Sequence, residues 1–515
     1  MSANDLSIKI NNTDLFTEKS LIFESHDLDQ DKISVPIANA KFGILNLKTI
    51  NSSLSKENIE IIFMVDRSGS MSDMCSDGRS KMQHICHTLS NMVIYFNENQ
   101  DINTHIIIHA FDDKIYNIIE RCKITKDNLD EVLYKINHIT PKNSTNIEMA
   151  LKDISSTVEK IRSEKNTSEI VSIFMTDGEV SNGKSDPGYL SQIVDNSINN
   201  YFIGFGVDHD AFLLNSLGNI TNSSYHFIDK IENSGYVYGE ILHEILYKLL
   251  FNVKIEVKNG LIYDYKINLW VDSLFVANIV SESNKIYHIV SASPEICIIS
   301  MNAEQNIYDK NGIEAIMLRE ISVFNENEVE DLTKYVFRQR TMQLLYNINN
   351  YNNRRQKKLG IFGRNRNISP INENNHLLKD QLNNFLSEMK KYMSENGMED
   401  DKIMKNLCDD IYILLRTFGT AYGPMYSCAR QTSQGTQRSY TVSHTPEDNN
   451  TKYVSKIPLT RQTHNIYVNP DDLIKDNVFS DTFNDISQHQ VSGLEDSPFL
   501  SPSAARVMRE ISQKE

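Results

Sequence analysis

The sequence predicts an α/β fold: a doubly wound, mainly parallel sheet with a flanking β-sandwich and a C-terminal helical region. Between residues 55 and 250 short apolar runs alternate with amphipathic helical patterns, which is typical of a parallel sheet covered on both faces. On either side of this stretch apolar and polar residues alternate one by one, as in half-exposed strands. From about residue 327 the apolar residues recur with a helical period.

The central stretch contains the buried strands. They are the apolar runs IEIIFMV from Ile59, THIIIHAF from Thr104, EIVSIFMT from Glu169 and YFIGFGV from Tyr201. Polar turn residues bound each run, as expected for strands that are buried on both faces. Between the runs, apolar residues recur at spacings of three and four and predict helices. We therefore expect residues 55–250 to form one α/β domain.

The flanks of this domain predict antiparallel strands. LSIKI and AKFGILNLKTI lie in an N-terminal β segment, residues 1–54, and FNVKIEV, LIYDYKINLWV, KIYHIVSA and EICIISMNA lie within or next to residues 251–305. Their alternation indicates strands with one face exposed. We expect the two flanks to build a single β-sandwich, with the α/β domain inserted between its strands.

The remainder divides into a predicted helical region, residues 306–423, and a polar, largely disordered tail, residues 424–515. Within the helical region the stretch 354–366 is strongly basic. It is either an RNA- or phosphate-binding loop or a solvated connector, and in an acidic protein we favour the connector. In the tail, CARQTSQGTQRSY and SPSAARVMREI are candidate docking segments.

The composition excludes several classes of partner. The chain of 515 residues carries 52 basic and 68 acidic residues, a net charge of −16, so nucleic acid is not an expected partner outside the basic stretch 354–366. The six cysteines lack paired short spacings, which favours reduced thiols over a disulfide framework or a zinc ribbon.

No apolar run approaches the ~18 residues of a membrane span, and the amino end has no signal-peptide pattern. We expect a cytoplasmic protein.

Carboxylates and hydroxyls follow the ends of two predicted strands. Asp66, Ser68 and Ser70 come directly after IEIIFMV, and Asp177 follows EIVSIFMT. Thr145 opens a predicted helix. Because ligands bind at the carboxyl ends of strands in open α/β sheets, these three loops are expected to converge and to offer hard oxygen ligands to Mg²⁺. Asp-x-Ser-x-Ser alone is a common turn pattern, and Thr145 alone would be read as a helix cap.

Taken together, the three motifs resemble the von Willebrand factor type A (VWA) domain, a Rossmann-like doubly wound sheet. The resemblance rests on DRSGSM at residues 66–71, STN at 144–146 and MTDGE at 175–179, and it covers roughly residues 55 to 250. Less specifically, the flanks resemble intracellular multidomain proteins in which a VWA domain accompanies a Vwaint-like, Hint-associated or ubiquitin-ligase region. Neither a Hint module nor RING-type Cys/His spacing is present in the sequence.

The VWA resemblance implies a metal-ion-dependent adhesion site (MIDAS). Mg²⁺, or Mn²⁺, would be held directly by Ser68, Ser70 and Thr145, while Asp66 and Asp177 would act through water. The remaining coordination position would take a carboxylate of a partner protein.

Other side chains are expected around this ion. Asp112 and Asp113 end another strand on the same edge, and Glu179 follows Asp177, so all three are candidates to order the water around the ion. The chain departs from the family in two places. Asn143 and Ser144 stand where relatives often carry glycine. The first loop is also long, so Cys75 and Asp77 are candidates to shape the rim of the metal site.

The expected function is therefore metal-dependent binding of a partner's Asp or Glu by an intracellular scaffold. An internal ligand from the tail, Glu495 or Asp496, is a second hypothesis. The alternatives are a Mg²⁺-dependent hydrolase and an accessory subunit of a ubiquitin-type or chaperone-type machine. No nucleophile elbow, phosphate loop or dinucleotide-binding glycine motif is present, so an enzyme is not expected.

Overall fold

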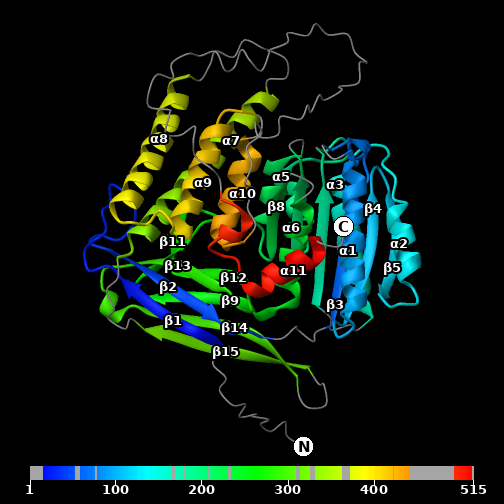
Figure 1. Cartoon of the computed structure of the whole chain (residues 1–515), viewed down its shortest axis with the longest axis horizontal. Helices are drawn as coiled ribbons and strands as arrows, with labels where there is room; N and C mark the ends of the chain where they lie inside the picture. The colour runs from blue at the N-terminus through cyan, green and yellow to red at the C-terminus, as the bar shows by residue number, and fades with distance from the viewer. Residues whose placement is uncertain are drawn as a thin grey trace, which may run out of the picture.

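The structure of the chain is a computed structural model. It describes residues 15–52, 58–75, 78–164, 169–178, 180–206, 209–229, 233–308, 314–324, 331–361, 372–420, 423–439 and 492–512. Figure 1 shows an α/β domain at the right, two antiparallel sheets at the lower left and a group of helices above them. The predicted fold class is confirmed.

The α/β domain is built on a six-stranded sheet with the order β5-β4-β3-β6-β7-β8. All neighbouring strands are parallel except β5, which pairs antiparallel with β4 at one edge. The strands are β3 (Ile59–Asp66), β4 (Thr104–Phe111), β5 (Ile115–Lys123), β6 (Glu169–Thr176), β7 (Asn199–Phe205) and β8 (Ser223–Ile228). Every residue of β3 is buried, which explains its mostly apolar sequence, and the carboxylate of the buried Glu60 accepts from Arg121.

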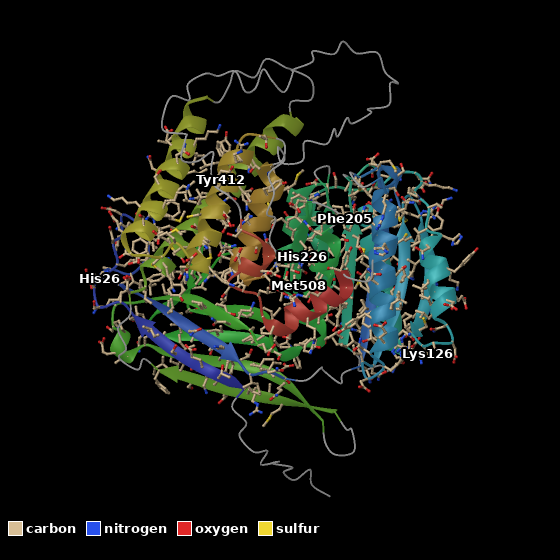
Figure 2. The ribbon with its side chains drawn as sticks, viewed as in Figure 1. His26, Lys126, Phe205, His226, Tyr412 and Met508 are labelled. Atoms are coloured by element: carbon tan, nitrogen blue, oxygen red, sulfur yellow. The ribbon has the colours of Figure 1, made fainter. Side chains whose placement is uncertain are left out.

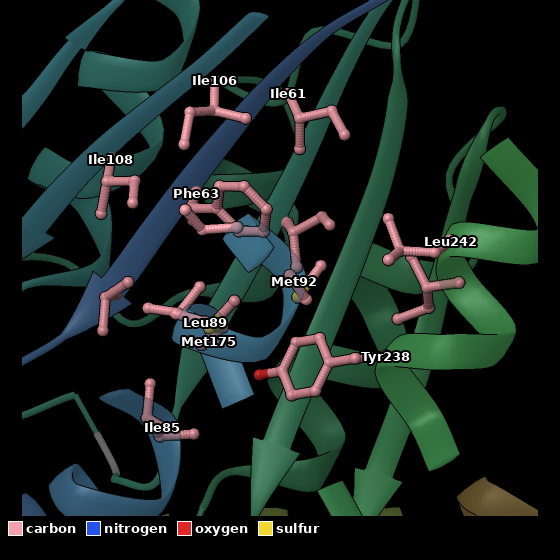
Figure 3. Close-up of a cluster of buried hydrophobic side chains, with 14 of the residues drawn as sticks. Ile61, Phe63, Ile85, Leu89, Met92, Ile106, Ile108, Met175, Tyr238 and Leu242 are labelled. Carbon is pink, nitrogen blue, oxygen red and sulfur yellow. The ribbon is translucent and has the colours of Figure 1, made fainter. Parts of the chain in front are cut away.

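Helices cover both faces of this sheet. One face packs against α1 (Lys81–Glu98), α2 (Leu129–Asn137) and α6 (Ser234–Leu246), and Figure 3 shows Phe63 of β3, Leu89 of α1 and Tyr238 of α6 meeting in that core. The other face packs against α3 (Ile147–Ser163), α4 (Pro187–Ser191) and α5 (Ala211–Gly218). Because both faces are covered, ligands can reach the sheet only at the ends of its strands.

Strands from before and after the α/β domain form one sandwich. Its sheets have the orders β1-β2-β13-β10-β11 and β12-β9-β14-β15, and the two share a hydrophobic core. The first comprises β1 (Phe16–Phe23), β2 (Lys41–Thr49), β10 (Leu261–Asp264), β11 (Leu269–Val271) and β13 (Asn284–Ser291). The second comprises β9 (Lys248–Lys258), β12 (Ser273–Val280), β14 (Ile298–Tyr308) and β15 (Glu314–Phe324). Since β2 pairs with β13, the α/β domain is inserted between neighbouring strands.

The helical region packs on both of these units. It contains α7 (Thr333–Ile361), α8 (Asn372–Glu395) and α9 (Lys402–Thr417), which share a core of their own. The start of α7 also covers the outer face of the first sandwich sheet, where Leu332 and Tyr335 join Phe42 and Ile286.

Two predicted boundaries are wrong. Residues 306–308 and 314–324 are strand rather than helix, because β14 and β15 extend the sandwich as a hairpin. The predicted disordered tail contains α10 (Gly423–Thr436) and α11 (Pro502–Ser512). Helix α10 is buried although it is polar, and its apolar residues Met425 and Tyr426 join the core of the α/β domain.

Helix α11 lies along α6 and α1 and buries residues at helical spacing, Ala504, Val507, Met508 and Ile511. A Cβ at Gly239 of α6 would lie 2.5 Å from Met508 Cα, so glycine permits this close approach. Figure 2 labels His226 on β8 near α10 and Met508 on α11, which mark where the two C-terminal helices meet the α/β domain.

None of the described helices combines the length with the apolar character that spanning a membrane requires.

Candidate functional site

Strand β3 ends by delivering three oxygen-bearing side chains onto one turn. Asp66 is the last residue of the strand, and a short 3-10 turn, η1 (Gly69–Ser72), follows at once. The backbone N–H of Ser68 donates to Asp66 Oδ1 at 2.7 Å, which fixes the turn, and the hydroxyls of Ser68 and Ser70 lie 3.1 Å apart. Ser68 is buried and Ser70 half-buried, so this pair lies at the surface end of the strand.

The neighbouring strand β6 supplies a second carboxylate to the same place. Ser70 Oγ donates to Asp177 Oδ1 at 2.7 Å, and Thr176 Oγ1 donates to Asp66 Oδ2 at 2.5 Å. Both aspartates are fully buried. Parallel pairing of β3 with β6 brings their carboxyl ends side by side and thereby assembles this part of the site.

The third loop places Thr145 beside these residues. A Cβ built on Gly178 would lie 3.3 Å from Thr145 Oγ1 and 3.5 Å from Ser70 Oγ, so the two hydroxyls face one glycine. Thr145 is held by its backbone, because its N–H donates to Ser181 Oγ at 2.7 Å and its carbonyl accepts from Ser181 N at 3.1 Å.

Helix capping does not occupy Thr145. The N-cap of α3 is Asn146, whose side chain accepts a hydrogen bond from the backbone of Met149. Within the described part of the chain Thr145 Oγ1 makes no hydrogen bond, which leaves this hydroxyl available to a ligand. The alternative prediction, that Thr145 caps the helix, is therefore wrong.

Asp112 and Asp113 orient the threonine loop. Asn143 has the left-handed backbone conformation, with φ +60°, and its side-chain amide donates to Asp112 Oδ2 at 3.2 Å and to Asp113 Oδ1 at 3.1 Å. The carbonyl of Asn143 in turn accepts from Gly69 N at 3.0 Å. An asparagine therefore replaces glycine here, because Asn tolerates positive φ and its side chain ties two loops together.

Two predicted neighbours of the site, Glu179 and Asp77, lie outside the described residues. Cys75 is described and half-buried, and its N–H donates to the carbonyl of Arg79 within the long first loop.

The electrostatics of the site are those of two carboxylates with too few positive charges nearby. Burial and the charge of Asp177 raise the pKa of Asp66 to about 7, although hydrogen bonds from Thr176 and Ser68 oppose the rise. The ammonium of Lys81 lies 2.7 Å from Asp177 Oδ2. Arg67 is directed elsewhere, with Nε 3.6 Å from Asp112 Oδ2 and its guanidinium 4.3 Å above the Tyr116 ring.

The residues fit a hard divalent cation. Three hydroxyls and two carboxylates offer only oxygen atoms, which Mg²⁺ and Mn²⁺ prefer. Among the described residues no group of three or more His, Cys, Asp or Glu side chains is placed to hold a metal, so a site at this sheet edge has to use hydroxyls.

Sequence reasoning missed Lys81 and the bonding role of Thr176. Lys81 is the first residue of α1, where the helix dipole disfavours a positive charge. A lysine there was therefore a sign that an anion lies nearby, but its partner Asp177 is 96 residues away in the sequence.

The other sequence candidates lie elsewhere. Glu495 lies in a 3-10 turn, η5 (Leu494–Asp496), where its carbonyl accepts from Lys402 at 3.0 Å and its carboxylate is 3.8 Å from Arg509. The structure thus gives this tail acid other partners than the candidate site. The basic stretch 354–366 begins within α7, and from residue 362 it is outside the described residues.

A six-stranded sheet of this topology, with hydroxyls and carboxylates gathered after its two central strands, defines a VWA-type domain. The family model described as "von Willebrand factor type A domain" matches residues 60–238, so the chain contains a domain of this family. The match covers the α/β sheet and leaves the sandwich and the helical region outside it. VWA domains often bind a divalent metal at a MIDAS and generally mediate protein interactions. No curated protein matches the chain.

Several solved structures are similar to the chain at low sequence identity. The chain is similar to the ArnB paralog VWA2 from Sulfolobus acidocaldarius, at 14% identity and a TM-score of 0.48 over 82% of this chain and 99% of that one. It is also similar to a von Willebrand factor type A protein from Catenulispora acidiphila, at 12% identity and a TM-score of 0.44 over 66% and 82%. Proximal thread matrix protein 1 from the mussel byssus, in a structure with a zinc-occupied MIDAS, is 17% identical with a TM-score of 0.26 over 36% and 44%.

Proposed function

We propose that this chain is a scaffold that binds a partner protein through a divalent cation, Mg²⁺ or Mn²⁺, held at the edge of its VWA sheet. Ser68, Ser70 and Thr145 would hold the ion, while Asp66 and Asp177 would act through water. The observation that carries the proposal is the convergence of three loops. Ser70 lies 3.1 Å from Ser68 and 2.7 Å from Asp177, and the Thr145 and Ser70 hydroxyls both face Gly178.

The bound ion would supply a positive charge that attracts a carboxylate of the partner. The chain's own residues orient the ligands. Thr176 and the backbone of Ser68 hold both oxygens of Asp66, and Asn143 ties the threonine loop to Asp112 and to Gly69. A site whose ligands are already in place loses little conformational entropy when the ion binds, which favours affinity.

We propose a binding role rather than a catalytic one. The two carboxylates nearest the hydroxyls are engaged, since Asp66 accepts hydrogen bonds from Ser68 and Thr176, and Asp177 accepts from Ser70 and Lys81. A general base for a Mg²⁺-dependent hydrolase would need a free carboxylate within reach of a substrate proton. An intracellular, cytoplasmic location is proposed on the spacing of the six cysteines, which lacks the close pairs of a disulfide framework.

Calorimetric titration of the full chain with MgCl₂ and with MnCl₂ tests the cation site. We expect binding by the wild type and its loss in Ser70→Ala. Ser72→Ala is the matched control, because Ser72 is an exposed serine of the same turn whose hydroxyl donates to Gly69 O at 2.7 Å. Equal binding by all three proteins would remove the site from this turn.

Partner capture tests the second half of the proposal. Immobilised wild-type chain is exposed to a cell extract in Mg²⁺ and then washed with EDTA, with Ser70→Ala and Ser72→Ala in parallel. Partners that leave in EDTA and that Ser70→Ala does not retain support binding through the ion. Partners that stay bound in EDTA contradict it.

A further inference from the structure

Lys81 lies where a solvated lysine is not expected. It opens helix α1 directly after Ser80, which forms a capping box with Gln83 and so fixes where the helix begins. Its side chain is only 7% exposed. A buried ammonium at a helix N-terminus is disfavoured both by desolvation and by the helix dipole, so an anion has to stabilise it.

That anion is Asp177. Lys81 Nζ lies 2.7 Å from Asp177 Oδ2 and 3.5 Å from the exposed Asp73. The two oxygens of Asp177 thus have different partners, because Oδ1 accepts from Ser70 and Oδ2 accepts from Lys81. One carboxylate connects the hydroxyls of the candidate site to a fixed cation of the chain.

The contact between Lys81 and Asp177 changes the net charge of the candidate site. In their ionised forms Asp66 and Asp177 together carry two negative charges, and Lys81 supplies one positive charge in contact with Asp177. Arg67 adds no positive charge beside Asp177, because its guanidinium pairs with Asp112. A divalent ion entering the site would be repelled by Lys81 and would share Asp177 with it.

We propose that Lys81 is a tethered cation that neutralises Asp177 when the site holds no metal and thereby lowers the affinity of the site for divalent cations. This inference rests on the proposed function, since it concerns the same site. The loaded site would carry one net positive charge because Lys81 remains beside it, and that charge favours an anionic partner. The pair makes the ion easier to release, so that partner binding can follow the supply of divalent cation.

The test is Mn²⁺ and Mg²⁺ titration by calorimetry of the full chain and three variants. Lys81→Met removes the charge and keeps most of the apolar stem, and we expect it to bind Mn²⁺ at least about tenfold more tightly. Lys81→Arg keeps the charge, so its affinity should stay close to that of the wild type. Lys248→Met is the matched control, because Lys248 also forms a largely buried ion pair, with Glu169 at the opposite end of β6.

Thermal unfolding in EDTA gives a second readout. Lys81→Met should unfold at a lower temperature than the wild type without metal, because two buried carboxylates then lack a cation, and excess Mn²⁺ should raise its unfolding temperature by more than it raises that of the wild type. The double variant Lys81→Met, Asp177→Asn should recover stability in EDTA. This variant separates loss of the ion pair from a general packing defect.

The outcomes are distinct. Equal Mn²⁺ affinity in wild type and Lys81→Met, or weaker binding in the variant, would overturn the role of Lys81 while leaving the cation site in place. Binding by Lys81→Met alone would support the role strongly. Absence of binding in every protein would overturn both this inference and the proposed function, and tighter binding in Lys248→Met as well would show a long-range charge effect that contradicts a role specific to Lys81.

Discussion

Two buried polar clusters in this molecule each pair an aspartate with a basic residue, but they differ in how fully the chain satisfies their polar groups. Where α9 meets α10, Arg430 and Asp410 form an ion pair with a distance of 2.8 Å between Nη1 and Oδ1, and both side chains are 1% exposed. Gln434 donates to the other oxygen of Asp410 at 2.7 Å, and Arg338 donates to the carbonyl of Gln434. We call these four residues the α10 cluster. At the sheet edge, by contrast, Asp177 accepts from Ser70 and Lys81. Asp66 accepts from Thr176 and from the backbone of Ser68.

The two clusters differ in the hydrogen-bonding capacity that the chain itself leaves unused. In the α10 cluster the charge of Asp410 is matched within the chain, and both of its oxygens accept hydrogen bonds. At the sheet edge Lys81 pairs with Asp177, while Asp66 is held by hydrogen bonds from uncharged groups, and the Thr145 hydroxyl makes no hydrogen bond within the described residues. A closed cluster fixes how elements pack, while an open one retains capacity for a ligand.

Breaking the closed cluster should have the largest effect. Arg430→Met leaves the buried carboxylate of Asp410 without its cation and should lower the free energy of unfolding by about 3–5 kcal/mol. Urea unfolding followed by circular dichroism measures it. The double variant Arg430→Met, Asp410→Leu should recover most of the loss, whereas a loss below about 1 kcal/mol in the single variant would show that the pair is not a structural anchor.

The second largest effect on stability is expected from His209, a buried histidine near the candidate site. Burial lowers the pKa of His209 to about 4 from 6.5. Its Nδ1 lies 2.7 Å from Gly206 O and its Nε2 lies 2.6 Å from the Tyr225 hydroxyl. Because the unfolded chain takes up this proton first, stability is full above pH 6.5 and should fall as the pH drops toward 4, by up to about 1.4 kcal/mol per pH unit.

His209→Asn should reduce this slope by about one proton between pH 6.5 and 4.5, measured as the free energy of unfolding at several pH values. His138→Asn is the control, because His138 is exposed. An unchanged slope in His209→Asn would contradict the assignment.

The open cluster predicts a smaller effect on stability and a clear one on affinity. Thr145→Val keeps the shape of the side chain and removes a hydroxyl that makes no hydrogen bond in the described structure, so the unfolding free energy in EDTA should change by less than about 1 kcal/mol. Mn²⁺ affinity should fall about tenfold, measured by calorimetry. Thr176→Val is the comparison, since its hydroxyl bonds Asp66 and its loss should destabilise the fold. Unchanged Mn²⁺ affinity in Thr145→Val would remove this residue from the site.

A surface pair should show the smallest effect. Arg340 and Glu388 join α7 to α8 by two hydrogen bonds of 2.7 Å, yet Glu388 is 41% exposed. Glu388→Ala should lower the unfolding free energy by less than about 1 kcal/mol, because solvent screens the pair. A loss comparable with that of Arg430→Met would mean that burial does not decide how much an ion pair contributes to the stability of this protein.

Strands and their ends could be predicted from the sequence because β3 and β6 are mostly apolar and are followed or ended by a carboxylate, Asp66 for β3 and Asp177 directly after β6. Their pairing brings Asp66 and Asp177 together, as expected for parallel neighbours. The insertion of the α/β domain into the sandwich likewise followed from alternating residues on both flanks, which the pairing of β2 with β13 realises.

Helix α10 could not be predicted in the same way. Its sequence, GPMYSCARQTSQGT, lacks an apolar stripe and therefore predicts a polar tail rather than a buried helix. Its burial depends on partners far away in the sequence, such as Asp410 for Arg430 and Arg338 for Gln434. Lys81 was missed for the same reason, because only the folded sheet places it against Asp177.

The most direct test of the central claim is a crystal of the full chain grown with Mn²⁺ and measured for anomalous scattering. The account predicts a peak in contact with the hydroxyls of Ser68 and Ser70. A map with no peak beside Ser68 and Ser70 at saturating Mn²⁺, or with its only peak elsewhere in the molecule, would contradict the assignment of this sheet edge as a cation site.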